Sequence, residues 1–582
     1  MQIFDANITD LVLDFFRRIL LGEKEYNHIN KSIEDLCGCK DFFLTEEDLI
    51  SFKNEFDQEN SLCVAEERSE YGDFQTNESL AKAVTEVVFS KGLVPEVIIE
   101  PTCGKGNFIL AALQRFPNVK EIIGIEIYNP YVWQCKFNIL NYFLSNNIPN
   151  KPIIRIIHAN VFNFDFYRLK EQIKDSKLLV LGNPPWVNNS TLGALESKNL
   201  PQKTNFKKQK GIDAITGKGN FDIAEYIVLS LMRIFEKKNG YMSLLVKNSV
   251  IKNVVYAQHT NEFFISEIEE MNIDSKKEFN VSVDASLLLC KFNSEPAMQC
   301  QVFDFYDQSP RVKFGWIGNH FYSDIAEKQD TIDGKCPLEW RQGIKHDCSS
   351  VMELQYDGGR YINKLNEEVQ LEDDMVYGIL KSSDLKCRVA ADPKKFVIIT
   401  QKSVGQNTEY ISRYPQTHAY LYKHIDLFRK RKSSIYRGRP EFSIFGVGDY
   451  SFKPYKVAIS GLYKTFHFTL VASNNKPIML DDTCYFLGFD ELKEAVVIHS
   501  LLNSDEVCHF LQSITFHDAK RMITKEVLMR IDFRKALKVI DIDTLVCRAN
   551  ETLSELESDS DLGKDVVRSI LDGYYKQLEL TF

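Results

Sequence analysis

The clearest chemical signal in the chain is a run of four residues, Asn183-Pro184-Pro185-Trp186. Residues 177–182 before them, apolar apart from Lys177, predict a buried strand. Two prolines at its end stop the hydrogen-bond ladder and fix the backbone. The side-chain oxygen of Asn183 and the carbonyl oxygen of Pro184 are then two acceptors in a rigid frame, to which a planar amino group could donate. Trp186 offers a flat ring for a stacked base.

Such a frame suits methylation of an exocyclic amine. The lone pair of this nitrogen is delocalised into its ring, so the amine is a poor nucleophile. Acceptors on its two N–H groups return electron density to the nitrogen and favour the pyramidal geometry of attack. A sulfonium methyl donor carries its own leaving group, so neither a covalent enzyme intermediate nor a metal is needed, and positioning is most of the catalysis. The competing interpretation is a structural Pro-Pro turn beside a core tryptophan.

A second signal lies upstream, where residues 97–108 predict a strand, a glycine-bearing turn and the start of a helix. Gly104 and Gly106 would let the backbone pass close to a ligand, and the helix start offers free N–H groups. The next strand ends in Glu126, where an acid accepts hydrogen bonds from ribose hydroxyls. Together these features favour a ribose-bearing cofactor over an ordinary turn. A P-loop is disfavoured because no Lys-Ser/Thr pair follows the glycines.

Short apolar runs alternate with helical patterns between about residues 70 and 300, which predicts a doubly wound, mostly parallel sheet. A further apolar run at 285–292 could add an edge strand or a hairpin. Predicted strands are 97–99, 121–127, 153–158, 178–181 and 241–246, with helices at 108–116 and 224–235.

The chain is expected to have three parts. Residues 1–68 carry an apolar stripe of helical spacing (Ile8, Leu11, Val12, Phe15, Phe16, Ile19) and predict a helical extension. Residues 69–300 form the α/β domain. Residues 301–582, with short strand-like pieces, basic clusters and helical tails, predict an α+β domain facing it across a basic cleft.

Taken together, these motifs resemble the amino-methyltransferases that use S-adenosylmethionine. Their order, with Tyr71-Gly72-Asp73-Phe74-Gln75-Thr76 before the glycine turn and a long region after Trp186, is similar to the gamma class of DNA adenine-N6 methyltransferases of bacterial type II restriction–modification systems. The resemblance covers residues 70–300 well and the rest only in layout. It implies a Rossmann-like catalytic domain followed by a DNA target-recognition domain.

The resemblance also implies roles for single residues. Thr76 would contact the methionine end of the cofactor, Glu126 its ribose, and Asp222 and Tyr226 would belong to a further pocket motif. Phe279, before Val281-Ser282-Val283, would stack on the flipped-out adenine. The methionine moiety would be lined by Glu100, Thr102, Cys103, Gly104 and Gly106, and the cofactor's adenine by Asn160 with Val161 or Phe162.

Two positions depart from the family pattern. Asn77 stands where the family usually has proline. Asn160 replaces an aspartate, although its side-chain oxygen can still accept from the adenine amino group.

A lone Phe279 before a strand is equally consistent with a core residue.

Flipping a base out of a duplex requires binding energy from phosphates and groove edges. Between Leu421 and Pro440 there are seven basic residues against one acid, although the whole chain carries a net charge of −10. A local patch is enough for a DNA groove. Arg437 and Arg439 could read guanine edges, and His517, Lys520 and Arg521 form a weaker candidate. The expected DNA contacts are Lys207, Lys208, Lys210, Lys430, Arg431, Lys432, Arg437 and Arg439.

Composition places few limits on this hypothesis. The chain has 582 residues, no long uncharged apolar run and no basic segment followed by an apolar one at its start, so neither a membrane span nor a signal peptide is expected. Thirteen scattered cysteines without a CxxC pair predict reduced thiols and no metal site. We expect a cytoplasmic bacterial monomer that acts on duplex DNA, with a restriction endonuclease as a separate partner.

Three alternatives remain open. The same chemistry could act on N4 of cytosine, on an RNA base or on a glutamine side chain, although Asn183 favours adenine and the long C-terminal region argues against RNA and protein substrates. The chain could be a catalytically silent specificity subunit, against which the intact Asn-Pro-Pro-Trp run argues. It could also be a fused restriction–methylation enzyme, but residues 1–68 are short for a nuclease domain and carry no nuclease-like carboxylate–lysine cluster.

Overall fold

The structure is a computed structural model that describes residues 2–21, 25–57, 75–148, 150–187, 222–281, 283–326, 332–473, 475–516, 521–556 and 561–579. The chain forms two compact units, Met1–Phe321 and Tyr322–Phe582. This division lies later than the expected boundary at residue 300, because β10, β11 and β12 extend the sheet of the first unit. The first 57 residues also belong to that unit and pack on its helix α6.

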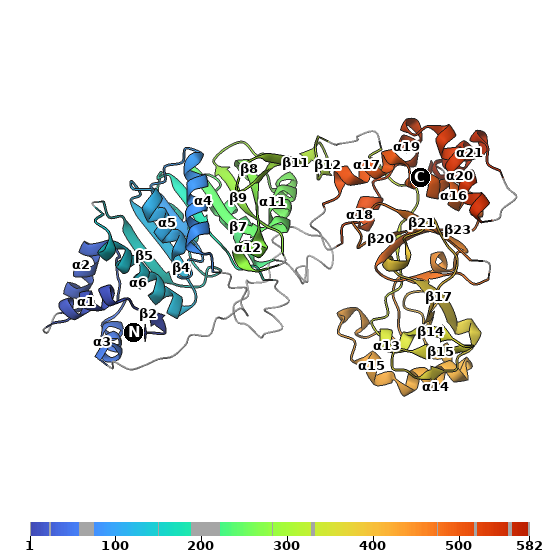
Figure 1. The fold of residues 1–582 in the computed structure, drawn as a ribbon, viewed down its shortest axis with the longest axis horizontal. Coiled ribbons are helices and arrows are strands. Elements are labelled where there is room, and N and C mark those ends of the chain that lie inside the picture. The colour runs from blue at the N-terminus through green and yellow to red at the C-terminus, as the bar shows by residue number, and fades with distance from the viewer. Residues whose placement is uncertain are drawn as a thin grey trace. The chain divides into compact units, whose positions relative to one another are not determined.

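A ten-stranded mixed sheet lies at the centre of the first unit (Figure 1). Strands β5, β4, β3, β6 and β7 run parallel. The fully buried sequences of β3 and β6 are typical of a strand covered on both faces. The order across the sheet is β12 (His320–Tyr322), β11 (Pro310–Ile317), β10 (Gln299–Asp304), β8 (Ile265–Ile273), β9 (Ala285–Phe292), β7 (Gly240–Lys247), β6 (Leu178–Gly182), β3 (Val97–Glu100), β4 (Glu121–Glu126) and β5 (Ile153–His158).

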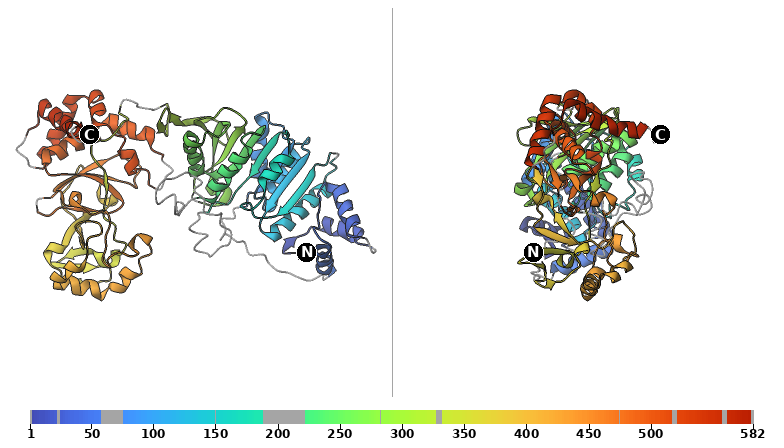
Figure 2. Two further views of the ribbon diagram at one scale, coloured as in Figure 1. Left: turned by 180° about the vertical axis from the view of Figure 1, so that it is seen from behind. Right: turned by 90° about the vertical axis from the view of Figure 1, so that its right-hand side faces the viewer.

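Helices lie on both faces of this sheet, as the views from opposite sides show (Figures 1 and 2). Helix α4 packs on α5, and α10 packs between α7 and α11. The predicted α/β fold with a mixed, mostly parallel sheet is therefore confirmed. The helices are α4 (Glu78–Ser90), α5 (Asn107–Arg115), α6 (Asn129–Ser145), α7 (Phe166–Gln172), α10 (Ile223–Phe235), α11 (Asn248–Asn261) and α12 (Ser275–Phe279).

Strand β9 decides between the two expectations for residues 285–292. It is not an edge strand, because it lies between β7 and β8 and pairs antiparallel with both. Its pairing with β8, the strand before it in the chain, is the expected hairpin with a long connection. Seven of its eight residues are buried. Its continuous apolar sequence reflects this central position, with a strand on either side and cover on both faces.

The N-terminal residues form a small hairpin and three helices on the outer side of α6. The apolar stripe of α1 is turned from the predicted one, because Leu13 is buried whereas Leu11 is exposed. The segment after α2 reaches the edge strand β5, where Cys39 pairs with Ile154 in an isolated bridge. This segment covers part of a sheet edge that would otherwise offer unpaired backbone groups. The elements are β1 (Gln2–Ile3), β2 (Ala6–Asn7), α1 (Asp10–Ile19), α2 (Tyr26–Cys37) and α3 (Glu46–Asp57).

The second unit contains two smaller sheets. A five-stranded sheet has the order β13 (Arg341–Gln342), β23 (Cys484–Phe489), β20 (Tyr455–Ser460), β21 (Phe468–Ala472) and β18 (Val389–Ala390). A six-stranded sheet has the order β16 (Glu368–Val369), β15 (Arg360–Asn363), β14 (Glu353–Asp357), β19 (Lys395–Ile398), β17 (Val376–Leu380) and β22 (Met479–Leu480). Strand β17 leads to the short helix η3 (Ser382–Asp384).

Helices cover these sheets in two groups. Helix α16 packs on β20, β21 and β23, and the C-terminal helices α17, α19, α20 and α21 pack on α16. Leu421 and Phe428, on α14 and α15, join the apolar core of the six-stranded sheet. The helices are α13 (Ser349–Met352), α14 (Pro415–Lys423), α15 (Ile425–Arg429), α16 (Leu492–Leu502), α17 (Asp505–Ile514), α18 (Lys525–Leu528), α19 (Phe533–Val539), α20 (Ile542–Glu555) and α21 (Lys564–Glu579). None of the helices in the described ranges is both long and apolar enough to cross a bilayer.

Candidate active site

The turn after β3 requires glycine at two positions. Gly104 and Gly106 have φ angles of +51° and +85°, in the left-handed region that glycine adopts without strain. A Cβ atom on Gly106 would lie 2.5 Å from Sγ of Cys135, and one on Gly104 would lie 2.8 Å from Oε1 of Gln75. Gly106 is also the N-cap of α5. The backbone therefore leads directly from this tight turn into the amino terminus of a helix, where ligand anions and acceptors bind.

Glu126 lies against the same turn. It is 8% exposed, and its Oε2 accepts a hydrogen bond of 2.9 Å from the backbone N–H of Gly104. Its Oε1 accepts one of 2.8 Å from the N–H of Tyr128. The carboxylate at the end of β4 is thus held by two backbone donors. A carboxylate at this position is the type of group to which a ribose hydroxyl donates.

Thr102 and Cys103 connect the turn to its neighbours. The N–H of Cys103 donates to the carbonyl of Ile125 at 2.8 Å, and Oγ1 of Thr102 donates to the carbonyl of Asn183 at 3.3 Å. A hydrogen bond with Cys135, together with burial, raises the pKa of the Cys103 thiol well above its usual range. Cys103 therefore stays a neutral thiol in the core, and Thr102 connects the turn to the segment after β6.

Glu100, the last residue of β3, is a buried carboxyl group. It is 3% exposed, and its Oε2 has no hydrogen-bond partner among the residues that the structure describes. Burial, reinforced by nearby Cys135 and Glu126, raises the pKa of Glu100 well above its usual range. A cationic group bound beside it would satisfy this oxygen and favour the ionised form. The site therefore fits a ligand with an ammonium group.

Asn183 directly follows the last residue of β6, at the edge of the sheet where open α/β folds bind their ligands. Its Nδ2 donates a 3.1 Å hydrogen bond to Oγ1 of Thr76, a buried residue before α4. The backbone of Thr76 is held in turn, because its carbonyl accepts from Nδ2 of Asn107 at 2.7 Å. Thr76 therefore anchors the Asn183 amide at Nδ2, a contact that the sequence pattern did not indicate.

Trp186 does not present an open ring. It is 5% exposed, and its Nε1 donates to the carbonyl of Leu245 in β7 at 3.2 Å. The ring of Phe279, at the end of α12, contacts it edge to face with centroids 4.9 Å apart. Phe279 is only partly buried. The indole is thus a wall anchored to the sheet, and of the two rings Phe279 is the accessible one.

The residues after β5 form a tight turn beside a cavity. Oδ1 of Asn160 accepts a 2.9 Å hydrogen bond from the N–H of Phe162, so this oxygen stabilises its own turn. Val161 and Phe162 line a cavity of about 690 Å³ that extends between α7, α10 and α11. Tyr226 lines the same cavity and contacts Phe162 edge to face, with centroids 5.7 Å apart. The structure thus brings the two predicted pocket segments together.

Asp222 has a structural task. It caps α10 by accepting from the N–H of Ala224 at 2.9 Å, and it forms a 2.6 Å ion pair with Lys247 at the end of β7. Both side chains of this pair are largely buried. The pair therefore fixes the start of α10 next to the segment that carries Trp186.

The basic cluster at 423–439 contains side chains with two different roles. Arg431 is internal, because its guanidinium group donates to the backbone carbonyls of His346, Phe428, Glu441 and Ser443. This corrects the expectation that Arg431 contacts DNA. Arg429 pairs with Glu441, and Lys423 with Glu367. Four cations are exposed and form no ion pair within the described ranges: Lys430, Lys432, Arg437 and Arg439.

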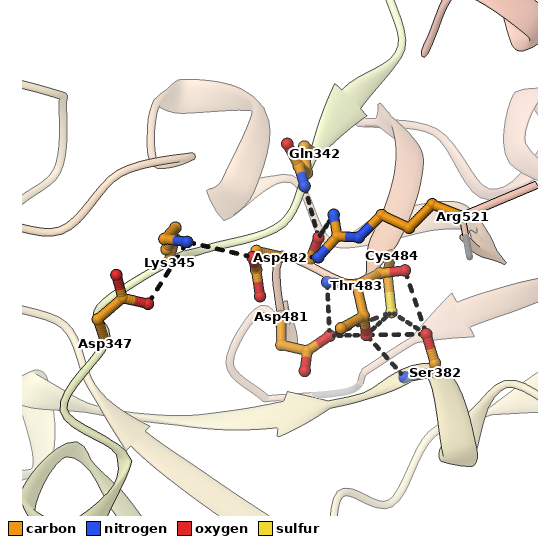
Figure 3. A network of polar contacts seen from close by, with 9 residues as sticks. All are labelled: Gln342, Lys345, Asp347, Ser382, Asp481, Asp482, Thr483, Cys484 and Arg521. Atoms are coloured by element: carbon orange, nitrogen blue, oxygen red, sulfur yellow. Dashed lines mark hydrogen bonds and ion pairs between the residues drawn. The ribbon is translucent and has the colours of Figure 1, made fainter. Parts of the chain in front are cut away.

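The other predicted DNA contacts are of two kinds. Lys207, Lys208 and Lys210 lie outside the described residues, as do His517 and Lys520. Arg521 is described, and it donates to the carbonyl of Asp482 at 3.0 Å (Figure 3). It thereby binds the turn between β22 and β23, which joins the two sheets of the second unit.

This turn is held from several sides (Figure 3). Oγ of Ser382, on η3, donates to Oγ1 of Thr483 at 2.8 Å, and the N–H of Thr483 donates to Asp481 at 3.1 Å. Burial raises the pKa of Asp481. The contacts of Ser382, Thr483 and Asp481 make this turn a structural junction between the two sheets.

The fold and the site together define a Rossmann-like methyltransferase domain: a glycine turn after β3, a carboxylate at the end of β4 and Asn-Pro-Pro-Trp after β6. The type II methyltransferase M.NspV from Nostoc sp. is 39% identical over 483 residues, which cover 82% of this chain and 99% of that protein. The chain therefore belongs to the type II methyltransferases, the DNA-methylating enzymes of restriction–modification systems.

A solved structure of a restriction-modification enzyme is also similar to this chain. The solved structure of the type IIL restriction-modification enzyme MmeI in complex with DNA matches 96% of this chain and 78% of its own, with a TM-score of 0.50 and 12% sequence identity. At this identity the match describes a shared fold. No family model matches the chain.

Proposed function

We propose that this protein transfers a methyl group from S-adenosylmethionine to the N6 amine of an adenine flipped out of duplex DNA. The observation that carries the proposal is the Asn183 amide at the carboxyl end of β6, held through Nδ2 by its 3.1 Å hydrogen bond to Thr76. With Nδ2 directed to Thr76, Oδ1 is the acceptor of this amide. Together with the carbonyl of Pro184 it forms the two-acceptor frame that an amino group requires.

The chain's own residues perform the positioning. Oδ1 of Asn183 and the Pro184 carbonyl accept from the two amine N–H groups, which increases electron density on the nitrogen and holds it in one orientation. Phe279 offers a ring on which the target base stacks, and Trp186 supports that ring from the sheet side. When bound, S-adenosylmethionine supplies an electrophilic methyl group on a sulfonium centre.

The cofactor would be held by the residues around the glycine turn. Glu100 is the buried carboxyl that pairs with the methionine ammonium group, and Glu126 accepts from the ribose hydroxyls. Gly104 and Gly106 keep the backbone free of side chains beside it. Val161 and Phe162 contact the adenine ring, with Asn160 shaping the turn that presents them.

We propose further that residues 322–582 recognise the DNA target, and that the protein works as a monomer beside a separate restriction endonuclease. The exposed cations Lys430, Lys432, Arg437 and Arg439 support this assignment, because phosphate contacts need unpaired positive charge. The segment with Lys207, Lys208 and Lys210 remains a sequence-based prediction of further contacts.

Methyl transfer from labelled S-adenosylmethionine to unmethylated bacterial genomic DNA, followed by nucleoside analysis, tests the proposal. We expect the label in N6-methyladenine and a loss of about a hundredfold to a thousandfold in rate for Asn183→Ala, because removal of one transition-state hydrogen-bonding group typically costs this much. Asn163→Ala, at an exposed position in the turn after β5, is the control. Label in N4-methylcytosine would correct the base. Cofactor binding without labelled DNA would point to RNA or protein, and absence of both would leave a silent specificity subunit.

A further inference from the structure

The segment before α4 is tied to the helix that carries Phe279. Asn77 is the N-cap of α4, and its Oδ1 accepts from the N–H of Leu80 at 2.8 Å. The other end of the same amide, Nδ2, donates to Oε2 of Glu278 at 3.2 Å. A proline at position 77 could form neither of these side-chain hydrogen bonds. The departure from the family pattern thus creates a contact between segments 201 residues apart.

Glu278 is held on both of its oxygens. Its Oε1 accepts from the hydroxyl of Tyr306 at 3.1 Å, and that hydroxyl accepts from the N–H of Asp274 at 3.3 Å. Lys277 lies 3.7 Å from the same oxygen, and the Glu278 side chain is only 10% exposed. The carboxylate thus connects Asn77 on one side with Tyr306 on the other, directly before Phe279.

These contacts close a circuit around the candidate active site. Thr76 holds the amide of Asn183, and its neighbour Asn77 binds Glu278. Phe279 follows Glu278 and contacts Trp186, which lies three residues after Asn183. The segment that orients the acceptor and the helix that carries the accessible ring are therefore joined by one hydrogen bond between side chains.

We infer that Glu278 is a positioning residue, which through Asn77 fixes the ring of Phe279 relative to the Asn183 frame. This inference rests on the proposed function, in which Phe279 stacks on the target base. The α12 helix has only five residues, so its own backbone hydrogen bonds fix it weakly. A carboxylate that binds both Asn77 and Tyr306 supplies the missing constraint.

Reversing the polarity of the hydrogen bond tests this role. Asn77→Asp retains the N-cap oxygen, because Asp and Asn cap helices about equally, but it removes the donor and places two carboxylates together. We expect about a tenfold fall in kcat/KM for DNA, the loss expected for one hydrogen bond to a charged group, with the dissociation constant of S-adenosylmethionine unchanged. In Asn77→Asp/Glu278→Gln, the new amide donates to the new carboxylate, so activity should recover to within about threefold of the wild type.

Hydrogen exchange provides a readout that does not depend on activity. Backbone amides of residues 274–281 should exchange faster in Asn77→Asp and return to the wild-type rate in the double variant. Lys276→Ala, an exposed substitution on the same helix, should change neither readout. Unchanged exchange and activity in Asn77→Asp, or a double variant no better than the single one, would overturn the inference. If the wild type does not methylate DNA but the exchange pattern is as expected, the positioning role stands and the proposed function fails.

Discussion

Buried groups at the candidate active site have protonation states set by their surroundings. Glu100 is the clearest case, because its carboxyl group lies in the core at the end of β3 with one oxygen unsatisfied among the described residues. Burial raises the pKa of Glu100 well above its usual range and so favours the neutral acid. A bound ammonium group favours the carboxylate. Cofactor binding and proton release are therefore coupled at this residue.

This coupling gives a prediction for cofactor affinity. Below the raised pKa of Glu100, binding of S-adenosylmethionine should release a proton from this residue, so affinity should increase with pH by up to about tenfold per unit. Calorimetry in buffers of different ionisation enthalpy, repeated at several pH values, measures the released protons. Glu100→Gln has nothing to release and should bind more weakly, with only the pH dependence of the ligand itself. Equal proton release by the variant and the wild type would contradict the assignment.

Among the elements of the second unit, strand β20 contains a buried lysine that lowers the free energy of unfolding. Lys456 is 1% exposed, and its Nζ donates to the carbonyl of Lys453 at 2.7 Å. Burial lowers the pKa of Lys456 to about 7. The unfolded chain, with an ordinary lysine, binds more protons than the folded one between about pH 7 and pH 10.5. The free energy of unfolding should therefore rise with pH across this window.

Lys456→Met should remove this penalty. We expect the variant to unfold with a free energy about 2–4 kcal/mol larger at pH 7.5, because methionine fills a similar volume without a buried amine. Its stability should no longer increase toward pH 10. Denaturant unfolding monitored by fluorescence at several pH values measures both effects. A destabilised Met variant with an unchanged pH profile would show that the amine has a structural role larger than its burial cost.

Over the whole molecule the net charge is negative, whereas one segment of the second unit is locally positive. The chain carries a formal charge of −10, yet four cations between 430 and 439 are exposed without ion pairs in the described ranges. Arg429 lies in the same segment but is paired with Glu441. DNA affinity should therefore depend on the four exposed cations more than on Arg429.

Replacing Lys430, Lys432, Arg437 and Arg439 by alanine should weaken DNA binding and reduce its salt dependence. Each lost phosphate contact lowers the slope of log K against log salt by about 0.9. Arg429→Ala is the matched control and should change this slope much less. Binding titrations at several salt concentrations measure the slopes. If the variant with all four alanine substitutions has the wild-type slope of log K against log salt, the DNA contacts lie elsewhere on the protein.

The sequence by itself determined the parts of this protein that are encoded locally. The strands of the parallel sheet, the glycine turn, Glu126 at the end of β4 and the Asn-Pro-Pro-Trp frame after β6 were each readable from a short stretch. In these stretches, apolar runs, glycine and proline restrict the backbone without help from distant residues.

Only the tertiary structure decided how distant segments meet. The pairing of Thr76 with Asn183, the burial of Trp186 against β7 and the central position of β9 all depend on partners far away in the chain. The internal position of Arg431 could not be predicted for the same reason. The neighbouring sequence does not show that its guanidinium group donates to backbone carbonyls of other segments. Side-chain contacts of this kind follow from packing between elements, which no local pattern records.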